Sequence, residues 1–257
     1  MRKPNFMIVG AQKSGTTFLY KHMRQHTDVF FSKDKEPHFF NKIGVNEGTF
    51  KKYLSDNFSA AEDQKWIGEA SALYLHSMSV ASRVERHVGP DVKIIICIRK
   101  PVDKAVSLYL HDYRKGRLKG NEPLCYTDRN GNCPSIDRSR YATYIMEFIS
   151  RFGHDNVKIM MFDDLVKDPG SFLLSAYDFL GLQAEVAGSF DKVNSGFDLV
   201  RDGDYLTVSD DAVIPVGTVR PYIPVSELNS LNARLSKDID ATSLLLGRDL
   251  SHWKESY

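Results

Sequence analysis

The stretch Gly10-Ala11-Gln12-Lys13-Ser14-Gly15-Thr16-Thr17 decides the fold class of this chain. It follows an apolar run, residues 6–9, that is typical of a buried strand, and it precedes residues 18–26, whose apolar side chains recur at helical spacing. A strand, a glycine-bounded loop and a helix form a cradle for an anion, because the loop amides and the helix N-terminus concentrate partial positive charge. The sequence therefore predicts phosphate binding by Lys13, Ser14, Gly15, Thr16 and Thr17, rather than a turn without a ligand.

The position of the lysine separates this loop from that of nucleotide triphosphatases. Their pattern, GxxxxGK[ST], requires lysine where this chain has Thr16. Lys13 instead lies in the middle of the loop. We therefore expect the loop to hold a phosphate for another kind of group transfer.

The rest of the chain alternates predicted strands and helices. Apolar runs predict further strands at residues 66–68, 92–98 and 157–162, and helical spacing is found at residues 79–88, 101–109, 141–152, 169–180 and 228–239. This alternation favours an α/β fold, a P-loop-type three-layer sandwich with a central, mainly parallel sheet. We expect a single domain over residues 1–257, with polar loops near 112–138 and 197–224.

The composition of the chain limits the classes of molecule that the protein is expected to bind. Apolar residues make up 42% of the 257 residues and charged residues 26%, which is typical of a globular protein. The formal net charge of +1 gives no general reason to expect binding to nucleic acid, polyanions or anionic membranes. No apolar stretch is long enough for a signal peptide or membrane anchor, so the expected location is the cytoplasm. The oligomeric state stays open.

The three cysteines fit that location. Cys97 lies in an apolar run and is expected in the core, whereas Cys125 and Cys133 bracket a loop. The latter pair has a spacing that permits a disulfide, but in a reducing compartment we expect both thiols to stay reduced. No spacing of cysteine and histidine predicts a zinc site.

Two more positions carry candidate chemistry. Arg99 ends the strand at 92–98 and Ser107 lies two turns into the next helix, so they are candidates for a clamp on a second phosphate; the alternative is an ion pair between Arg99 and a carboxylate. Glu36 lies among apolar and aromatic residues, which favours a raised pKa and a role as general base. Alternatively Glu36 is a surface acid, and His38 is a competing base.

The chain resembles the PAPS-dependent sulfotransferases, in the branch that contains heparan sulfate sulfotransferases and bacterial natural-product enzymes. The resemblance rests on GAQKSGTT at 10–17, KEPHFF at 35–40, IRKPVDKAVSLYLH at 98–111, KVNS at 192–195 and LGRDLSHW at 246–253. It implies that Lys13 to Thr17 hold the 5′-phosphosulfate, that Arg99 and Ser107 bind the 3′-phosphate, and that Glu36 takes a proton from the acceptor. It also implies adenosine 3′,5′-bisphosphate as product and no metal.

The chain departs from the family pattern in two places. Relatives often carry lysine after the acid at Glu69, where this chain has Ala70, which leaves one cation near the sulfuryl group unassigned. No clear KGR-type loop is found near the C-terminus, and Arg220 is our candidate for its contact with the 3′-phosphate.

The predicted function is sulfuryl transfer to a hydroxyl or amine of a small soluble acceptor, such as an alkaloid-type metabolite. The aromatic and acidic residues of the loops near 112–138 and 197–224 are expected to line the acceptor site. The alternatives are a small-molecule kinase, with Asp163 as the candidate metal ligand, a glycan sulfotransferase, and a regulatory module that binds nucleotide without turnover.

Overall fold

The computed structural model describes residues 2–127, 131–183 and 197–257. They fall into two compact units, Met1–Arg99 with Thr143–Asp191 and Lys100–Ala142 with Lys192–Tyr257. The chain first passes from one unit to the other directly after Arg99. The single domain expected over residues 1–257 stays a prediction.

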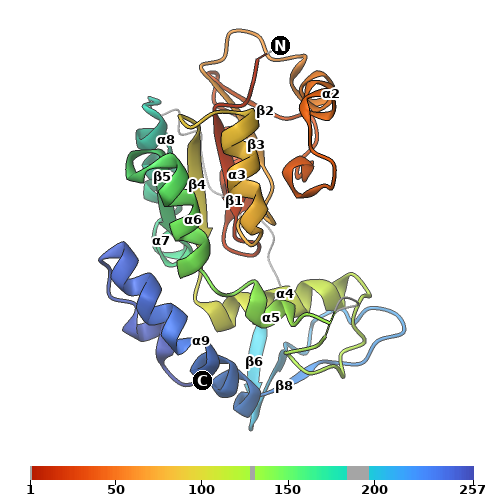
Figure 1. Ribbon diagram of the computed structural model, residues 1–257. Helices are drawn as coiled ribbons and strands as arrows, with labels where there is room; N and C mark the ends of the chain where they lie inside the picture. Colours follow the sequence, from red (N-terminus) through yellow and green to blue (C-terminus); the bar gives the residue numbers. More distant parts are fainter. Residues whose placement is uncertain (1, 128–130, 184–196) are drawn as a thin grey trace. The chain divides into compact units, whose positions relative to one another are not determined.

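The first unit is built on a sheet of parallel strands in the order β2-β3-β1-β4-β5 (Figure 1). The strands are β1 Phe6–Gly10, β2 Val29–Phe31, β3 Trp66–Ala70, β4 Lys93–Ile98 and β5 Val157–Met161. Strand β4 is buried from Ile94 to Ile98, as expected of a central strand covered on both faces. The sheet confirms the predicted α/β class.

Helices cover this sheet on both faces. The chain crosses from β1 to β2 in one direction along the sheet and from β3 to β4 in the other, so right-handed connections place α1 and α3 on opposite faces. Helices α3 and α6 lie over the face seen in Figure 1. On the other side Phe18 of α1 meets Phe172 of α8, with ring centroids 6.0 Å apart. The helical segments are α1 Thr16–Met23, η1 Phe39–Asn41, α2 Glu47–Phe58, α3 Met78–His87, α6 Ala142–Phe152, η2 His154–Asn156, α7 Phe162–Lys167 and α8 Pro169–Leu180.

The second unit combines helices with a small antiparallel sheet in the order β6-β7-β8. Its elements are α4 Pro101–Arg114, α5 Pro134–Asp137, β6 Leu199–Asp202, β7 Tyr205–Val208, β8 Tyr222–Pro224, α9 Val225–Leu246 and η3 Ser251–Lys254. The sequence predicted an irregular loop near 197–224, yet these three strands lie within it. Strand β6 is exposed along its whole length. Its residues do not alternate between apolar and polar, so the sequence does not mark it as a strand.

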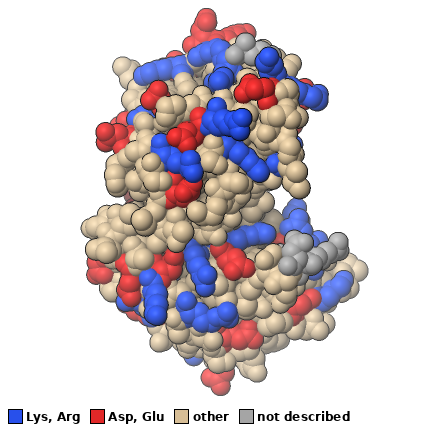
Figure 2. Space-filling view, viewed as in Figure 1, with Lys and Arg blue, Asp and Glu red and all other residues tan. Residues whose placement is uncertain are grey.

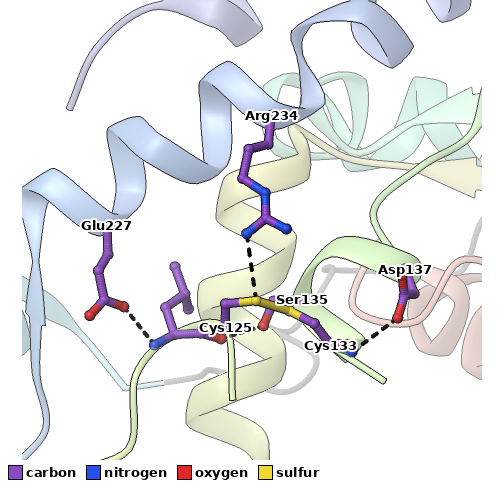
Figure 3. The surroundings of a disulfide bond; sticks show 7 residues. Cys125, Cys133, Ser135, Asp137, Glu227 and Arg234 are labelled. Carbon is purple, nitrogen blue, oxygen red and sulfur yellow. Dashed lines mark hydrogen bonds between the residues drawn. A yellow bond between two sulfur atoms is a disulfide. The ribbon is translucent and has the colours of Figure 1, made fainter. Parts of the chain in front are cut away.

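A disulfide joins Cys125 to Cys133, so the expectation that both thiols stay reduced is wrong for this structure (Figure 3). The two Cα atoms are 5.6 Å apart, within the usual range for a disulfide. Local hydrogen bonds hold both flanks: Leu124 N donates to Glu227 Oε2 at 2.8 Å, and Cys133 N donates to Asp137 Oδ2 at 3.0 Å. The spacing of Cys125 and Cys133 permits the bond but does not by itself show whether it forms. Cys97 is a free, buried thiol, as predicted.

Charge is mixed on the visible face of each unit. Figure 2 shows lysine and arginine side chains interspersed with aspartate and glutamate over that face. Within the described part of the chain, every helix is too short or too polar to span a bilayer.

Candidate active site

The phosphate loop lies between β1 and α1, where the sequence predicted it. Gly10 leaves the strand beside Ala72 and Leu75, and a Cβ on Gly10 would lie 2.8 Å from the carbonyl oxygen of Ala72. Ala11 N donates to the carbonyl of Cys97 at 2.6 Å, which fixes the start of the loop against the end of β4. Gly15 is the N-cap of α1 with φ 96°, a conformation that side chains disfavour. These close approaches make a backbone cradle that suits an anion.

Lys13, the cation of the loop, has a strained backbone conformation. Lys13 has φ 64°, in the left-handed region that non-glycine residues rarely adopt. Such strain costs of order 1–3 kcal/mol and is concentrated at functional sites. Lys13 is half-buried, Ser14 and Thr16 are buried, and Thr17 is half-buried. The loop therefore presents an ammonium group, hydroxyls and helix-terminal amides in one short segment.

Arg99 lies beside this loop, as its position after β4 predicted. Its Nη1 donates to the carbonyl of Lys13 at 3.5 Å, and its guanidinium lies 4.4 Å from the ring centroid of Phe162. Stacking on an aromatic face suits a guanidinium and keeps its edge available for hydrogen bonds. The ends of β1 and β4 thus bring two predicted cations together.

The acid segment, residues 35–40, carries Glu36 and His38 in the same unit. His38 Nε2 lies 3.3 Å from Glu36 Oε2, and Glu36 N donates to the carbonyl of Ala70 at 3.0 Å. Both residues lie in the left-handed region, with φ 59° for Glu36 and 51° for His38. Two strained residues with interacting side chains are typical of a site where geometry matters more than stability.

The electrostatics of Glu36 differ from our expectation. The hydrogen bond from His38 and the charge of Lys35 lower the pKa of Glu36 despite its partial burial, so the expected raised pKa is wrong. Lys35 Nζ lies 3.7 Å from Glu36 Oε1. Glu36 is therefore ionised at neutral pH and ready to accept a proton. By contrast, burial raises the pKa of Glu69, which is fully buried.

Lys35 is a candidate functional residue that the sequence did not single out. Its Nζ donates to Thr17 Oγ1 at 3.0 Å, so one ammonium group contacts both the phosphate loop and the acid segment. The signal was a lysine immediately before Glu36, but sequence alone does not show that it reaches Thr17. Ala70, where relatives often carry lysine, is buried at the end of β3.

A family model described as the sulfotransferase domain matches residues 3–199. The chain belongs to the sulfotransferase family.

Solved structures agree on the fold of this sulfotransferase. The crystal structure of a sulfotransferase from Alicyclobacillus acidocaldarius is similar with a TM-score of 0.74 at 24% identity, covering 99% of this chain and 100% of that one. The sulfotransferase domain from the curacin biosynthetic pathway is similar with a TM-score of 0.51 at 15% identity, covering 91% of this chain and 98% of that one. At these identities the likeness concerns the fold.

Curated relatives are longer proteins. The membrane-associated sulfotransferase kil1 of Dictyostelium discoideum is 30% identical over 124 residues, which is 48% of this chain and 26% of the relative. Heparan sulfate glucosamine 3-O-sulfotransferase 3A1 of Mus musculus is 26% identical over 186 residues, which is 70% of this chain and 46% of the relative. The sulfotransferase chain thus spans less than half the length of these two relatives.

Two predicted phosphate ligands belong to the second unit. Ser107 lies on α4 and is half-buried. Arg220 Nη1 donates to the carbonyls of Val208 at 2.7 Å and Ser209 at 3.0 Å, and it lies 3.4 Å from Asp210 Oδ1. These contacts tie Arg220 to the turn after β7. Binding of the 3′-phosphate by Ser107 and Arg220 stays a prediction.

The kinase alternative would use a metal ion held by side chains of the protein. Among residues 2–127, 131–183 and 197–257, no three histidine, cysteine or carboxylate side chains gather closely enough to hold a metal ion. Asp163, the candidate ligand, lies in the first turn of α7. Independence from metal remains a prediction for this sulfotransferase.

Proposed function

We propose that this protein transfers the sulfuryl group of PAPS to a hydroxyl or amine of a small acceptor. The observation that carries the proposal is the contact of Lys35 with both Thr17 and Glu36, which joins an anion cradle to an ionised carboxylate. A cradle that ends at a general base suits group transfer. A regulatory binding module has no need of the base.

The cradle of Gly10 to Thr17 suits the phosphosulfate group, since a glycine-bounded loop that leads into the N-terminus of α1 concentrates partial positive charge. PAPS supplies a sulfuryl group on a good leaving group, adenosine 3′,5′-bisphosphate. Lys13 balances charge on the departing phosphate oxygen, and Lys35 balances charge beside Glu36. Arg99 holds the second phosphate in this proposal, and the roles of Ser107 and Arg220 stay predictions from the sequence.

Glu36 is the general base in this proposal. Its carboxylate accepts the proton of the acceptor O–H or N–H while the acceptor atom forms a bond to sulfur. The bond between sulfur and the bridging oxygen breaks, and its electron pair leaves with the nucleotide. Atoms and charge balance without a metal ion or an oxidant. His38 orients Glu36 through the contact at 3.3 Å.

The acceptor is the finer part of the proposal. Tyr205 and Tyr222 form an edge-to-face pair with centroids 5.9 Å apart, and their exposed fractions are 45% and 49%. Exposed aromatic faces suit an amphipathic acceptor. Other loop residues already have structural contacts: Glu122 accepts from Lys119 N and Gly120 N, and Tyr126 donates to Asp112 Oδ2 at 2.7 Å. Asp128 lies outside the described residues.

The test is an incubation with sulfur-labelled PAPS or phosphorus-labelled ATP and a panel of phenols, aromatic amines and heparan-derived oligosaccharides. We expect sulfated product from PAPS with a phenol or amine. Lys13→Ala is expected to lower turnover by about 100- to 1000-fold while weakening binding of adenosine 3′,5′-bisphosphate much less. Lys33→Ala is the control for removal of a lysine, because Lys33 is exposed and belongs to the same unit as Lys13.

Three results would decide against parts of this proposal. Metal-dependent transfer from ATP would favour the kinase, and binding of PAPS without product from any acceptor class would favour the regulatory module. A clear preference for heparan oligosaccharides would overturn the small-molecule acceptor while leaving the reaction intact.

A further inference from the structure

The buried carboxyl of Glu69 is the feature that the mechanism above does not use. Glu69 lies next to Ala70 at the end of β3 and is fully buried. A buried carboxyl needs hydrogen-bond donors around it, because burial without partners is strongly unfavourable. Glu69 therefore either contributes to stability alone or also positions residues of the proposed active site.

Three hydroxyl groups surround this carboxyl. Ser71 Oγ donates to Glu69 Oε1 at 2.6 Å, the hydroxyl of Tyr53 donates to Glu69 Oε2, and the hydroxyl of Tyr74 also donates to Glu69. Hydrogen bonds to a carboxylate are stronger and more directional than those between neutral groups. Each hydroxyl has a single hydrogen, so a bond to Glu69 fixes its direction and leaves its lone pairs facing elsewhere.

Two of these hydroxyls accept hydrogen bonds from the acid segment. His38 N donates to Ser71 Oγ at 3.2 Å, and Phe40 N donates to the hydroxyl of Tyr74 at 3.1 Å. Ser71 is in turn fixed to the sheet, because its own N–H donates to the carbonyl of Ile8 in β1 at 3.0 Å. Relays of two hydrogen bonds therefore join Glu69 to the backbone at residues 38 and 40.

Tyr53 provides an internal comparison. Its hydroxyl also contacts Glu69, and its ring stacks on Phe39 with centroids 4.3 Å apart. Tyr53 thus meets the acid segment through its ring, whereas Tyr74 meets it through a hydrogen bond from the backbone of Phe40. Both tyrosines are buried and donate a hydrogen bond to the same carboxyl. Only the hydroxyl of Tyr74 also accepts a hydrogen bond from the backbone of the acid segment.

We propose that Glu69 is a positioning residue: through Ser71 and Tyr74 it holds the left-handed backbone of Glu36 and His38 in the conformation that aims the base. The proposal rests on the assignment of Glu36 as base. Left-handed residues persist only where the surroundings determine them, and the relays from Glu69 supply that determination at His38 and Phe40. Glu69 itself does not touch the reacting atoms.

The experiment compares Glu69→Gln, Tyr74→Phe and Tyr53→Phe with the unaltered protein. The amide of Glu69→Gln keeps the size of the side chain but replaces one accepting oxygen with a donor. Tyr74→Phe and Tyr53→Phe each remove one hydroxyl from the same buried cluster. The measurements are kcat and KM with labelled PAPS and the best acceptor from the panel, the Kd for adenosine 3′,5′-bisphosphate, and hydrogen exchange at the amides of residues 36–40.

We expect Glu69→Gln and Tyr74→Phe to lower kcat by about 10- to 100-fold, since small misplacements of a catalytic group have effects of this size. The Kd for the nucleotide should change by less than about twofold, because the phosphate loop is held by other contacts. The amides of His38 and Phe40 should exchange faster. Tyr53→Phe should lower the melting temperature similarly to Tyr74→Phe while keeping kcat within about threefold.

The outcomes separate this inference from the function itself. If Glu36→Gln abolishes turnover and Glu69→Gln leaves kcat unchanged, the inference fails and the base stands. If Glu36→Gln keeps full turnover, the assignment of Glu36 as base fails. Unchanged hydrogen exchange at residues 36–40 in Tyr74→Phe would show that Tyr74 does not hold the backbone of this segment. If Tyr53→Phe loses as much kcat as Tyr74→Phe, Glu69 acts only on general stability. Should Glu69→Gln fail to fold, the two phenylalanine variants still decide.

Discussion

Glu36 and Glu69 show how surroundings give two glutamates opposite properties. His38 and Lys35 lower the pKa of the half-buried Glu36, whereas complete burial raises the pKa of Glu69 against the effect of its three hydroxyl donors. A proton acceptor at neutral pH must be ionised, and Glu36 meets that condition. Glu69 is positioned to organise its neighbours instead.

The first prediction concerns the pH dependence set by His38. Activity requires ionised Glu36 and is lost as the pH falls through its pKa. Because the hydrogen bond of His38 is the largest cause lowering that pKa, His38→Ala should raise it. The acid limb of kcat/KM should therefore move to higher pH, toward the ordinary glutamate value of about 4.3.

The measurement is kcat/KM from about pH 3 to 8, a range that extends below the ordinary value for glutamate and above that for histidine. His154→Ala is the control, since His154 is an exposed histidine in the same unit. An acid limb that stays in place would show that His38 does not set the pKa of Glu36. Uniform loss of activity at every pH in His38→Ala, with activity retained in Glu36→Gln, would identify His38 as the base.

At the residue scale, the sequence predicted the motifs formed by neighbouring residues but not the contacts between residues that lie far apart in the chain. The loop from Gly10 to Thr17 and the position of Arg99 follow from strand ends and spacing, and the structure brings them together. The contact of Lys35 with Thr17 joins residues 18 apart, and the contact of Tyr53 with Glu69 joins residues 16 apart. Neither pair leaves a pattern in the sequence, because each depends on how separate elements pack against one another.

At the scale of elements, predictions succeeded where apolar runs are long. Strand β4 and the helix that begins at Pro101 were found from such signals. Strand β2 has three residues, too few to establish a period. Helix α2 was not predicted, although the reciprocal hydrogen bonds of Asn46 and Thr49 form a capping box at its start.

The junction of β1, the loop and α1 yields a prediction about Gly15. Its φ of 96° disfavours a side chain, and a Cβ would lie 2.8 Å from Cδ2 of Leu165 in α7. Gly15→Ala must therefore displace the loop or the side chain of Leu165. We expect the affinity for adenosine 3′,5′-bisphosphate to fall by at least about tenfold, which corresponds to the loss of one charged hydrogen bond.

Gly153→Ala is the matched control, because Gly153 also has a positive φ, 77°, but among the described residues no atom lies within 4 Å of where its Cβ would be. Both variants carry backbone strain, whereas only Gly15→Ala carries a clash beside the phosphate loop. Calorimetric titration with the nucleotide gives the affinity, and thermal unfolding gives the stability. Equal affinities in the two variants would show that the loop tolerates the added methyl group.

At the scale of the whole molecule, the two units divide the predicted site. Lys13, Glu36 and Arg99 belong to the first unit, and Ser107 and Arg220 to the second. The single domain expected over residues 1–257 stays a prediction, because alternating strands and helices carry no mark of where packing divides. The KVNS segment at 192–195 lies outside the described residues.

The disulfide of the second unit bears on the compartment of the protein. Disulfides persist in oxidising compartments and are rare in the cytoplasm, so the bond between Cys125 and Cys133 stands against the predicted cytoplasmic location, which remains untested. The bond closes a short loop with a sequence separation of 8. Cross-links of this kind stabilise mainly by restricting the unfolded chain.

We predict that the protein purified without reductant contains one titratable thiol after unfolding, that of Cys97, and that reduction releases the thiols of Cys125 and Cys133. Cys133→Ser should lower the free energy of unfolding by about 2–3 kcal/mol in the absence of reductant, because the unfolded loop regains its freedom. With reductant present, the unaltered protein and Cys133→Ser should unfold alike, which separates the cross-link from the loss of a sulfur atom. Alkylation inside intact cells before lysis, followed by mass spectrometry, then tests the compartment. Alkylated Cys125 and Cys133 would place the protein in a reducing environment and overturn the disulfide as a native feature. If both cysteines escape alkylation because they are paired, the cytoplasmic prediction is overturned.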